Sequence, residues 1–177
     1  MSEESAGEIL AWDSSALHHA LSADRADVLL HLSGAASRGT TRHITTLAVV
    51  QELAGNGLGP PPEIETVPVD GLLELVALAD WVGRLSSSRH NRGEATICAW
   101  AQVHNAIAIV DDRDARTAAQ RAGLNVHGSL WLVARAVQAG STDLGSAGNL
   151  VDTLLAAGAR YPFAAGGFAV WMKTLSP

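Results

Sequence analysis

The run Ala106-Ile107-Ala108-Ile109-Val110-Asp111-Asp112-Arg113 decides the fold class of this chain. Its first five residues are all apolar, which is typical of a strand buried within a parallel sheet. The run stops at two aspartates, and helical periodicity follows over 113–122. In an open parallel sheet, ligands bind outside the carboxyl ends of the strands. The run therefore predicts an α/β sheet with acidic residues at that edge.

The rest of the chain alternates short strand patterns with helical periodicity. Because this alternation is typical of parallel sheets, we expect a mostly parallel central sheet flanked by helices. Residues 55–62 and 86–92 carry the glycine, proline and polar side chains of surface loops. The expected strands are 8–12, 42–46, 64–69, 106–110 and 125–127, and the expected helices are 14–21, 24–36, 47–53, 72–85, 93–104, 113–122, 130–139 and 150–157.

Length and composition indicate a globular protein. The 177 residues suit one domain over 8–177 after a flexible tail of residues 1–7. Cys98 is the only cysteine, which excludes an internal disulfide and a cysteine-rich zinc site. The acidic N-terminus is unlike a secretory signal, and no apolar run approaches the ~18 residues of a membrane span. We therefore expect a cytoplasmic protein without a membrane partner.

The net charge of −6 argues against a general nucleic-acid coat, because binding to the phosphate backbone favours a basic face. It does not exclude a nuclease, which concentrates carboxylates in its active site and needs only a local basic rim.

Carboxylates occur where four segments of the predicted sheet begin or end. Asp13 follows the first strand, and the pair Asp111-Asp112 follows the apolar strand. Glu52 lies one or two turns into a helix that follows another strand, and Glu94 opens the helix before the apolar strand. Carboxylates that converge without basic partners repel one another unless a cation neutralises them. Mg²⁺ or Mn²⁺, hard ions that prefer oxygen ligands, would do so and would support phosphodiester hydrolysis.

Each of these acids also has a purely structural interpretation. An aspartate at a strand end is often a helix cap or a turn former, and Glu52 by itself fits a solvated helix position. Spacing alone leaves the two interpretations open.

Two motifs resemble a branch of the PIN-domain superfamily. The first is Ile109-Val110-Asp111-Asp112-Arg113-Asp114-Ala115-Arg116, followed by Gly123-Leu124-Asn125-Val126-His127-Gly128-Ser129 and an apolar helix. The second, Gly93-Glu94-Ala95, is similar to the Gly-Glu-Ala helix start of that branch. Asp13, followed by Ser14 and Ser15, resembles the opening aspartate of that branch. Val50-Gln51-Glu52-Leu53 resembles the second acidic motif of the branch. The likeness spans about residues 8–160.

The resemblance implies a flavodoxin-like three-layer sandwich and a Mg²⁺- or Mn²⁺-dependent endoribonuclease. Many members are VapC-type toxins that are dimeric and restrained by an antitoxin. By motif position the catalytic acids are Asp13, Glu52, Glu94 and Asp112, and the expected metal ligands are Asp13, Glu94, Asp111 and Asp112. The last ligand stays open between Asp111 and Asp112, and Asp114 is a further possibility, although its position favours a first-turn helix carboxylate.

Three arginines are candidate contacts for RNA phosphates. Arg89 and Arg92 precede Glu94, where a solvated polar loop is an equal alternative. Arg116 follows Asp112 by one helical turn, where orienting a carboxylate is the favoured role.

The chain departs from the family pattern at three places. Ser129 stands where the family usually has threonine, and Trp131 replaces a small residue. From Tyr161 onward the likeness fades, and the apolar residues there are expected to cover the core or to form a dimer or partner surface.

Together these features predict a metal-dependent endoribonuclease that acts on RNA as the toxin of a toxin–antitoxin pair and forms a homodimer. The alternative is a non-catalytic PIN-like module that binds nucleic acid or a protein. Convergence of all four acids would favour the enzyme.

Overall fold

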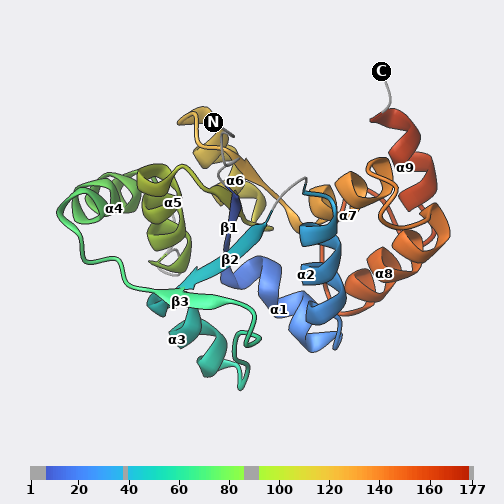
Figure 1. Ribbon diagram of the computed structural model, residues 1–177, viewed down its shortest axis with the longest axis horizontal. Helices are drawn as coiled ribbons and strands as arrows, with labels where there is room; N and C mark the ends of the chain where they lie inside the picture. Colours follow the sequence, from blue (N-terminus) through green and yellow to red (C-terminus); the bar gives the residue numbers. More distant parts are fainter. Residues whose placement is uncertain (1–6, 38–39, 86–91, 176–177) are drawn as a thin grey trace, which may run out of the picture.

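A computed structural model of the chain describes residues 7–37, 40–85 and 92–175 (Figure 1). Within these ranges the strands are β1 Glu8–Trp12, β2 Thr41–Thr46, β3 Glu65–Val67, β4 Ile107–Ile109 and β5 Val126–His127. The helices are α1 Ser14–Ser22, α2 Ala26–Ala35, α3 Leu47–Gly55, α4 Leu72–Arg84, α5 Arg92–His104, α6 Arg113–Arg121, α7 Ser129–Gln138, α8 Leu144–Ala156 and α9 Phe168–Thr174.

The described strands form one sheet in the order β3-β2-β1-β4-β5, and every pairing is parallel. The predicted parallel sheet is therefore confirmed. The apolar strand β4 lies in its interior, next to β1, with Trp12 opposite Ile109. Because the strands run in one direction, the residues that follow β1, β2 and β4 meet at a single edge of the sheet.

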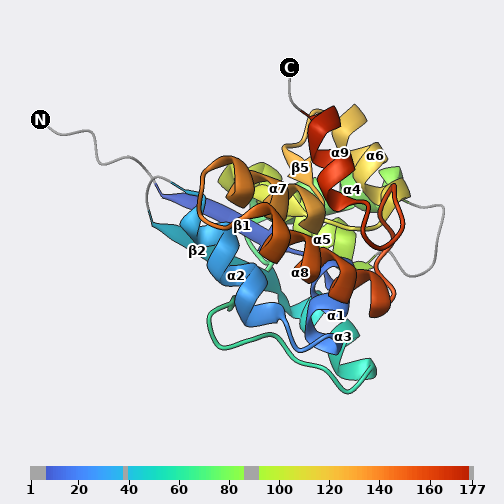
Figure 2. The ribbon, with the colours of Figure 1, turned by 90° about the vertical axis from the view of Figure 1, so that its right-hand side faces the viewer.

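Helices cover both faces of the sheet and make a three-layer α/β sandwich. Helix α5 contacts β1, β2 and β4, and α4 packs against its outer side. On the other face, α2 and α7 lie side by side, with α8 and α9 beyond them (Figures 1 and 2). Buried side chains from these layers, including Leu10, Trp12, Ile109 and Leu132, form one continuous core.

The C-terminal region packs on the core. Phe168 is buried, and Phe163, Trp171 and Met172 pack against it and its neighbours as partly buried side chains. The first of the two expected roles, covering the core, is thus the one observed.

Most expected elements occur with boundaries shifted by a few residues, but two differences are larger. Helix α8 begins at Leu144, not at 150, and its N-cap Asp143 accepts a hydrogen bond from the Ser146 backbone N–H (2.9 Å). Helix α9 was not expected at all. The helix-weakening Gly145 and Gly148 hide the start of α8, and α9 forms where its aromatic side chains pack on the core. Residues 1–6 of the expected tail and 86–91 of the expected loop lie outside the described residues.

No helix in the described ranges is long and apolar enough to cross a bilayer.

Candidate active site

Asp13 lies directly after β1 and is fully buried. It is the N-cap of α1, because its Oδ2 accepts hydrogen bonds from the Ser15 backbone N–H (2.9 Å) and from Ser15 Oγ (2.5 Å). The Ser15 hydroxyl oxygen also accepts from the backbone N–H groups of Asp111 (3.0 Å) and Asp112 (3.3 Å). Ser15 therefore ties the end of β1 to the end of β4, a role that sequence patterns do not reveal.

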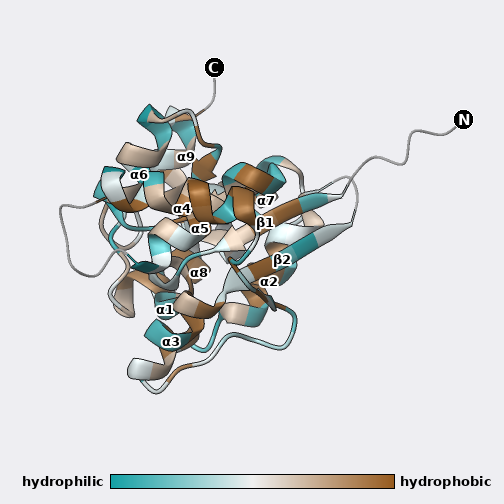
Figure 3. Cartoon of the chain, turned by 90° about the vertical axis from the view of Figure 1, so that its left-hand side faces the viewer, coloured by the Kyte–Doolittle hydropathy of each residue, from teal (hydrophilic) through white to brown (hydrophobic). Residues whose placement is uncertain are grey.

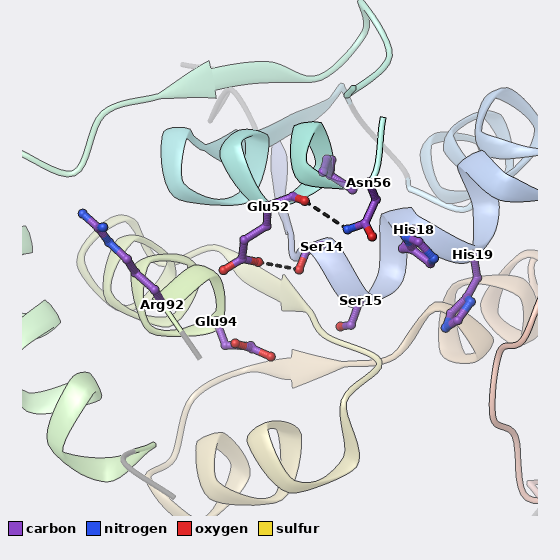
Figure 4. A pocket seen from close by; sticks show the side chains of 9 residues that line it. Ser14, Ser15, His18, His19, Glu52, Asn56, Arg92 and Glu94 are labelled. Carbon is purple, nitrogen blue, oxygen red and sulfur yellow. Dashed lines mark hydrogen bonds between the residues drawn. The ribbon is translucent and has the colours of Figure 1, made fainter. Parts of the chain in front are cut away.

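Glu52 projects from α3 between the first turns of α1 and α5 (Figure 4). Its Oε2 accepts from Ser14 Oγ (2.7 Å), and its Oε1 accepts from the Gly93 backbone N–H (2.8 Å). A Cβ at Gly93 would lie 2.8 Å from the carboxyl carbon of Glu52, so only glycine lets this carboxylate reach the start of α5. Both oxygens of Glu52 thus hold two helix starts together.

Glu94, in the first turn of α5, is buried and faces the same site. Burial, together with the negative charges of Asp13, Glu52 and Asp112, raises the pKa of Glu94 to about 8. Burial likewise raises the pKa of Asp13 to about 6, partly opposed by its hydrogen bonds with Ser15. Glu94 therefore lies within electrostatic reach of Asp13, Glu52 and Asp112.

The adjacent aspartates after β4 point to different surroundings. Asp112 is exposed and is the N-cap of α6, with Oδ1 accepting from the Ala115 backbone N–H (2.8 Å). Asp111 turns toward α7, where Ser129 donates to it from its backbone N–H (2.7 Å) and from Oγ (2.6 Å). Asp114 is exposed in the first turn of α6. The charge of Asp112 raises the pKa of Glu94, while both carboxylate oxygens of Asp111 already accept hydrogen bonds from Ser129.

Ser129 explains why the departure from threonine at this position is mild. Its hydroxyl group, which threonine shares, makes the hydrogen bond to Asp111 and contacts the Tyr161 hydroxyl (2.8 Å).

The three candidate RNA-binding arginines are placed differently. Arg92 is exposed and borders the site, and in Figure 4 its guanidinium points away from the carboxylates of Glu52 and Glu94. Arg116 donates from Nη1 to the backbone carbonyls of Val110 (2.9 Å) and Asp111 (3.0 Å), so it holds the end of β4. Arg89 lies outside the described residues.

A cavity of about 500 Å³ opens onto Glu52 and Glu94. The side chains that face it include hydroxyl, imidazole, amide and carboxylate groups from α1, α3 and α5 (Figure 4). They are Ser14, Ser15, His18, His19, Glu52, Leu53, Asn56, Arg92 and Glu94.

Two buried oxygens in this site make no hydrogen bond, Oδ1 of Asp13 and Oε2 of Glu94. A buried carboxylate oxygen without a partner is costly, and a hard divalent cation is the ligand that such oxygens prefer. The donor chemistry therefore fits a Mg²⁺ or Mn²⁺ ion. In the described ranges, however, no three His, Cys, Asp or Glu side chains already stand in a metal-binding arrangement, so binding would require side-chain rotation.

Comparison with known proteins gives one result. A family model described as the PIN domain matches residues 13–165, from the aspartate after β1 to beyond α8. No curated protein matches the chain. The matched segment contains all four acids and the whole sheet except β1. The chain therefore belongs to the PIN-domain family.

Proposed function

We propose that this protein is a divalent-metal-dependent endoribonuclease that hydrolyses RNA phosphodiester bonds. PIN domains are generally nucleases and typically use divalent ions. The observation that supports catalysis most directly is the pair of buried carboxylate oxygens, on Asp13 and Glu94, that lack hydrogen-bond partners, together with the open cavity that Glu94 lines.

In this proposal Asp13, Glu94 and Asp112 hold the ion. When bound, Mg²⁺ or Mn²⁺ supplies a Lewis acid that stabilises charge on the phosphodiester and lowers the pKa of a water. Ser15 keeps Asp13 and the end of β4 in register, because its hydroxyl group contacts both. Glu52 fixes the start of α5, and with it Glu94, through the Gly93 backbone N–H.

Asp111 and Arg116 then act as positioning residues. Asp111 joins the end of β4 to the start of α7 through Ser129, and Arg116 binds two carbonyls of the same strand end. We propose Asp112 as the last metal ligand in preference to Asp111 or Asp114, because both oxygens of Asp111 already accept hydrogen bonds from Ser129 and the charge of Asp112 acts on Glu94.

The test is cleavage of a fluorescently labelled single-stranded RNA in Mn²⁺, in Mg²⁺ and in EDTA. We expect cleavage that depends on the ion and that falls at least a hundredfold in the Glu94→Gln and Asp112→Asn variants. Asp114→Asn, the same chemical change two residues from Asp112, is the matched control and should retain activity. Equal rates in Asp112→Asn and wild type would refute this ligand assignment.

A non-catalytic PIN-like module that binds nucleic acid or protein is the second candidate. One observation favours it: among the described residues no three acidic or imidazole side chains form a ready-made metal site. RNA binding that is unaffected by EDTA, together with no cleavage in Mn²⁺, would support the module and refute the enzyme.

We further propose that the enzyme is the toxin of a type II toxin–antitoxin pair, restrained by an antitoxin protein. The support is the likeness of residues 93–135 to the branch of the PIN-domain superfamily in which many members are VapC-type toxins. Expression of the wild-type chain should arrest bacterial growth, and expression of Asp13→Asn should not. A small antitoxin-like gene beside this one should restore growth.

We also propose that the protein forms a homodimer through α4. The large exposed apolar side chains concentrate on this helix, whereas most C-terminal aromatic groups pack on the core. They are Leu72 (79% exposed), Leu73, Leu75, Val76 and Val82. In Figure 3 the ribbon of α4 carries hydrophobic residues, coloured brown. Clusters of exposed apolar side chains often mark protein–protein contact sites.

A second copy suits this helix because large outward residues of its first half can face small outward residues of its second half, Ala79 and Gly83. In an antiparallel pair about a two-fold axis between Ala77 and Leu78, Leu72 meets Gly83 and Val76 meets Ala79 of the partner. The same axis brings Arg84 close to the opposite charge of Asp70. Sedimentation should show a wild-type dimer and a Val76→Asp monomer. Val170→Asp, which changes the exposed α9, is the matched control and should stay dimeric; a wild-type monomer at high concentration would refute the interface.

A further inference from the structure

A second cavity, of about 280 Å³, lies between α6, α7 and α9. Its walls include four aromatic rings, those of His127, Trp131, Tyr161 and Trp171, and the aliphatic side chains of Leu130 and Ala134. The volume is close to the lower end of small-molecule sites, ~300 Å³, so it suits a single flat ring system. We call this cavity the aromatic pocket.

The walls of the aromatic pocket are held in place by contacts among their side chains. His127 stacks on Trp131 with ring centres 3.9 Å apart and an angle of 11° between planes, and the Arg135 guanidinium lies 4.5 Å from the Trp131 ring. Ser129 Oγ holds the Tyr161 hydroxyl (2.8 Å). Trp171 packs on the ring of Phe163, 5.5 Å between centres. The tryptophan that replaces a small residue of the related family thus builds a wall of this pocket.

The aromatic pocket lies next to a cleft that reaches the carboxylate site. A larger cleft of about 960 Å³ shares with it Asp111, Arg116, Arg160, Tyr161 and Pro162, and extends to Ser15 and Asp112. A chain that lies with one phosphate at Asp112 can therefore continue along this cleft into the pocket.

Three arginines lie along the same path, beside the three aspartates Asp111, Asp112 and Asp114 that line the carboxylate end of the cleft. Arg113, Arg116 and Arg160 all line the larger cleft. Within the described part of the chain, none of the three forms an ion pair with a carboxylate. The one acid that reaches the aromatic pocket, Asp111, has its oxygens occupied by Ser129, so the pocket does not present a free carboxylate to a phosphate.

We propose that the aromatic pocket binds one base of a single-stranded RNA while Arg160 and Arg116 contact the adjoining phosphate. This assignment rests on the proposed function and names where its substrate lies. Every base has a flat face that can stack on aromatic side chains, so such a site accepts RNA with little sequence preference. The bases of a duplex are paired and stacked within it and cannot enter such a pocket, which favours single-stranded RNA.

Binding is measured by fluorescence anisotropy in Mg²⁺ with a labelled octanucleotide and with its abasic counterpart, which keeps the ribose and phosphate groups. The protein carries Asp13→Asn so that the RNA stays intact. We expect the octanucleotide to bind about tenfold more tightly than the abasic chain. Gln120 is an exposed residue of α6 that lines the pocket. Gln120→Trp introduces a ring that would fill the pocket, and it should abolish that preference without disturbing the aromatic packing. Trp171→Leu should reduce it.

Arg160→Ala should weaken binding of both probes three- to tenfold. It should also reduce the steepness with which the logarithm of the binding constant falls with the logarithm of the salt concentration, by about 0.7, as expected for one lost phosphate contact with a single strand. Arg121→Ala removes an exposed arginine of α6 that does not line either cavity and should leave both affinities and the slope unchanged.

Two results would overturn the assignment: equal affinity for the two probes in the Asp13→Asn protein, or an RNA preference that survives Gln120→Trp. Equal losses in Arg160→Ala and Arg121→Ala would overturn the phosphate contact. These results are independent of cleavage, so a wild-type protein that binds RNA in the aromatic pocket but does not cut it in Mn²⁺ would refute the proposed function and leave the pocket intact.

Discussion

Replacing Asp13 with asparagine should stabilise the metal-free protein near neutral pH while abolishing Mn²⁺-dependent cleavage. The carboxylate is fully buried, and its pKa rises from 3.8 to about 6, mainly through burial. The difference of about 2 between these pKa values corresponds to about 3 kcal/mol of unfavourable free energy when the group is ionised in the folded state. The side-chain carbonyl of the introduced asparagine can still accept from Ser15, so the helix cap remains.

Part of this gain is lost, because the new amide N–H₂ takes the place of the buried Oδ1 that already lacks a partner. An unsatisfied buried donor costs about 1–2 kcal/mol, which leaves a net gain of about 1–2 kcal/mol. For a chain of this length that gain raises Tm by about 2–8 °C.

The effect should depend on pH in a defined direction. Between pH 4 and 6 the folded protein holds a proton on Asp13 that the unfolded chain releases, so the free energy of unfolding falls as pH rises through this interval and stays low above it. The stabilisation by Asp13→Asn should therefore be full at pH 7.5 and absent or reversed at pH 4.5. Thermal unfolding in EDTA at both pH values measures it, and added Mn²⁺ should raise the Tm of the wild type much more than that of the variant.

Asp143→Asn is the matched control. Asp143 is also an N-cap that accepts from a serine backbone N–H and hydroxyl, but it is exposed, and these hydrogen bonds lower its pKa. Neutralising it should leave stability unchanged or slightly reduced at pH 7.5. A large fall in Tm for Asp13→Asn would show that Asp13 is a structural cap, and normal RNA cleavage by that variant would show that the acid cluster does not drive the reaction.

Three further substitutions separate the roles of the neighbouring groups. Glu94→Gln should raise the metal-free Tm at pH 9, above the folded-state pKa of about 8, and should have little effect at pH 4; a fall in Tm at pH 9 would contradict the burial of its charge. Gly93→Ala should leave far-ultraviolet circular dichroism unchanged yet reduce cleavage at least tenfold, because its Cβ overlaps the Glu52 carboxylate; normal cleavage would show that Glu52 does not position α5. Ser129→Ala should lower Tm by about 2–8 °C through the lost hydrogen bond to Asp111, and Ser129→Thr should restore it, as thermal unfolding would measure.

Local patterns were sufficient for the architecture. The apolar run 106–110 and the alternation around it predicted the parallel sheet, because a strand buried on both faces must be apolar at every position. Each acid also occurs at a strand end or in the first turns of a helix, as expected for Asp13, Glu52, Glu94 and Asp112. These features depend on neighbours close in the chain. By contrast, α9 was missed because its stability comes from packing on distant residues.

The direction in which each carboxylate points was decided only by tertiary structure. Asp111 and Asp112 are chemically identical and adjacent, yet one meets Ser129, 18 residues along the chain, and the other caps α6 beside Glu94. Ser15 joins β1 to β4 across 96 residues, a contact without any local signal. Sequence periodicity determines which residues reach the edge of the sheet. The packing of helices from elsewhere in the chain determines which oxygens are hydrogen-bonded there and which remain buried without a partner.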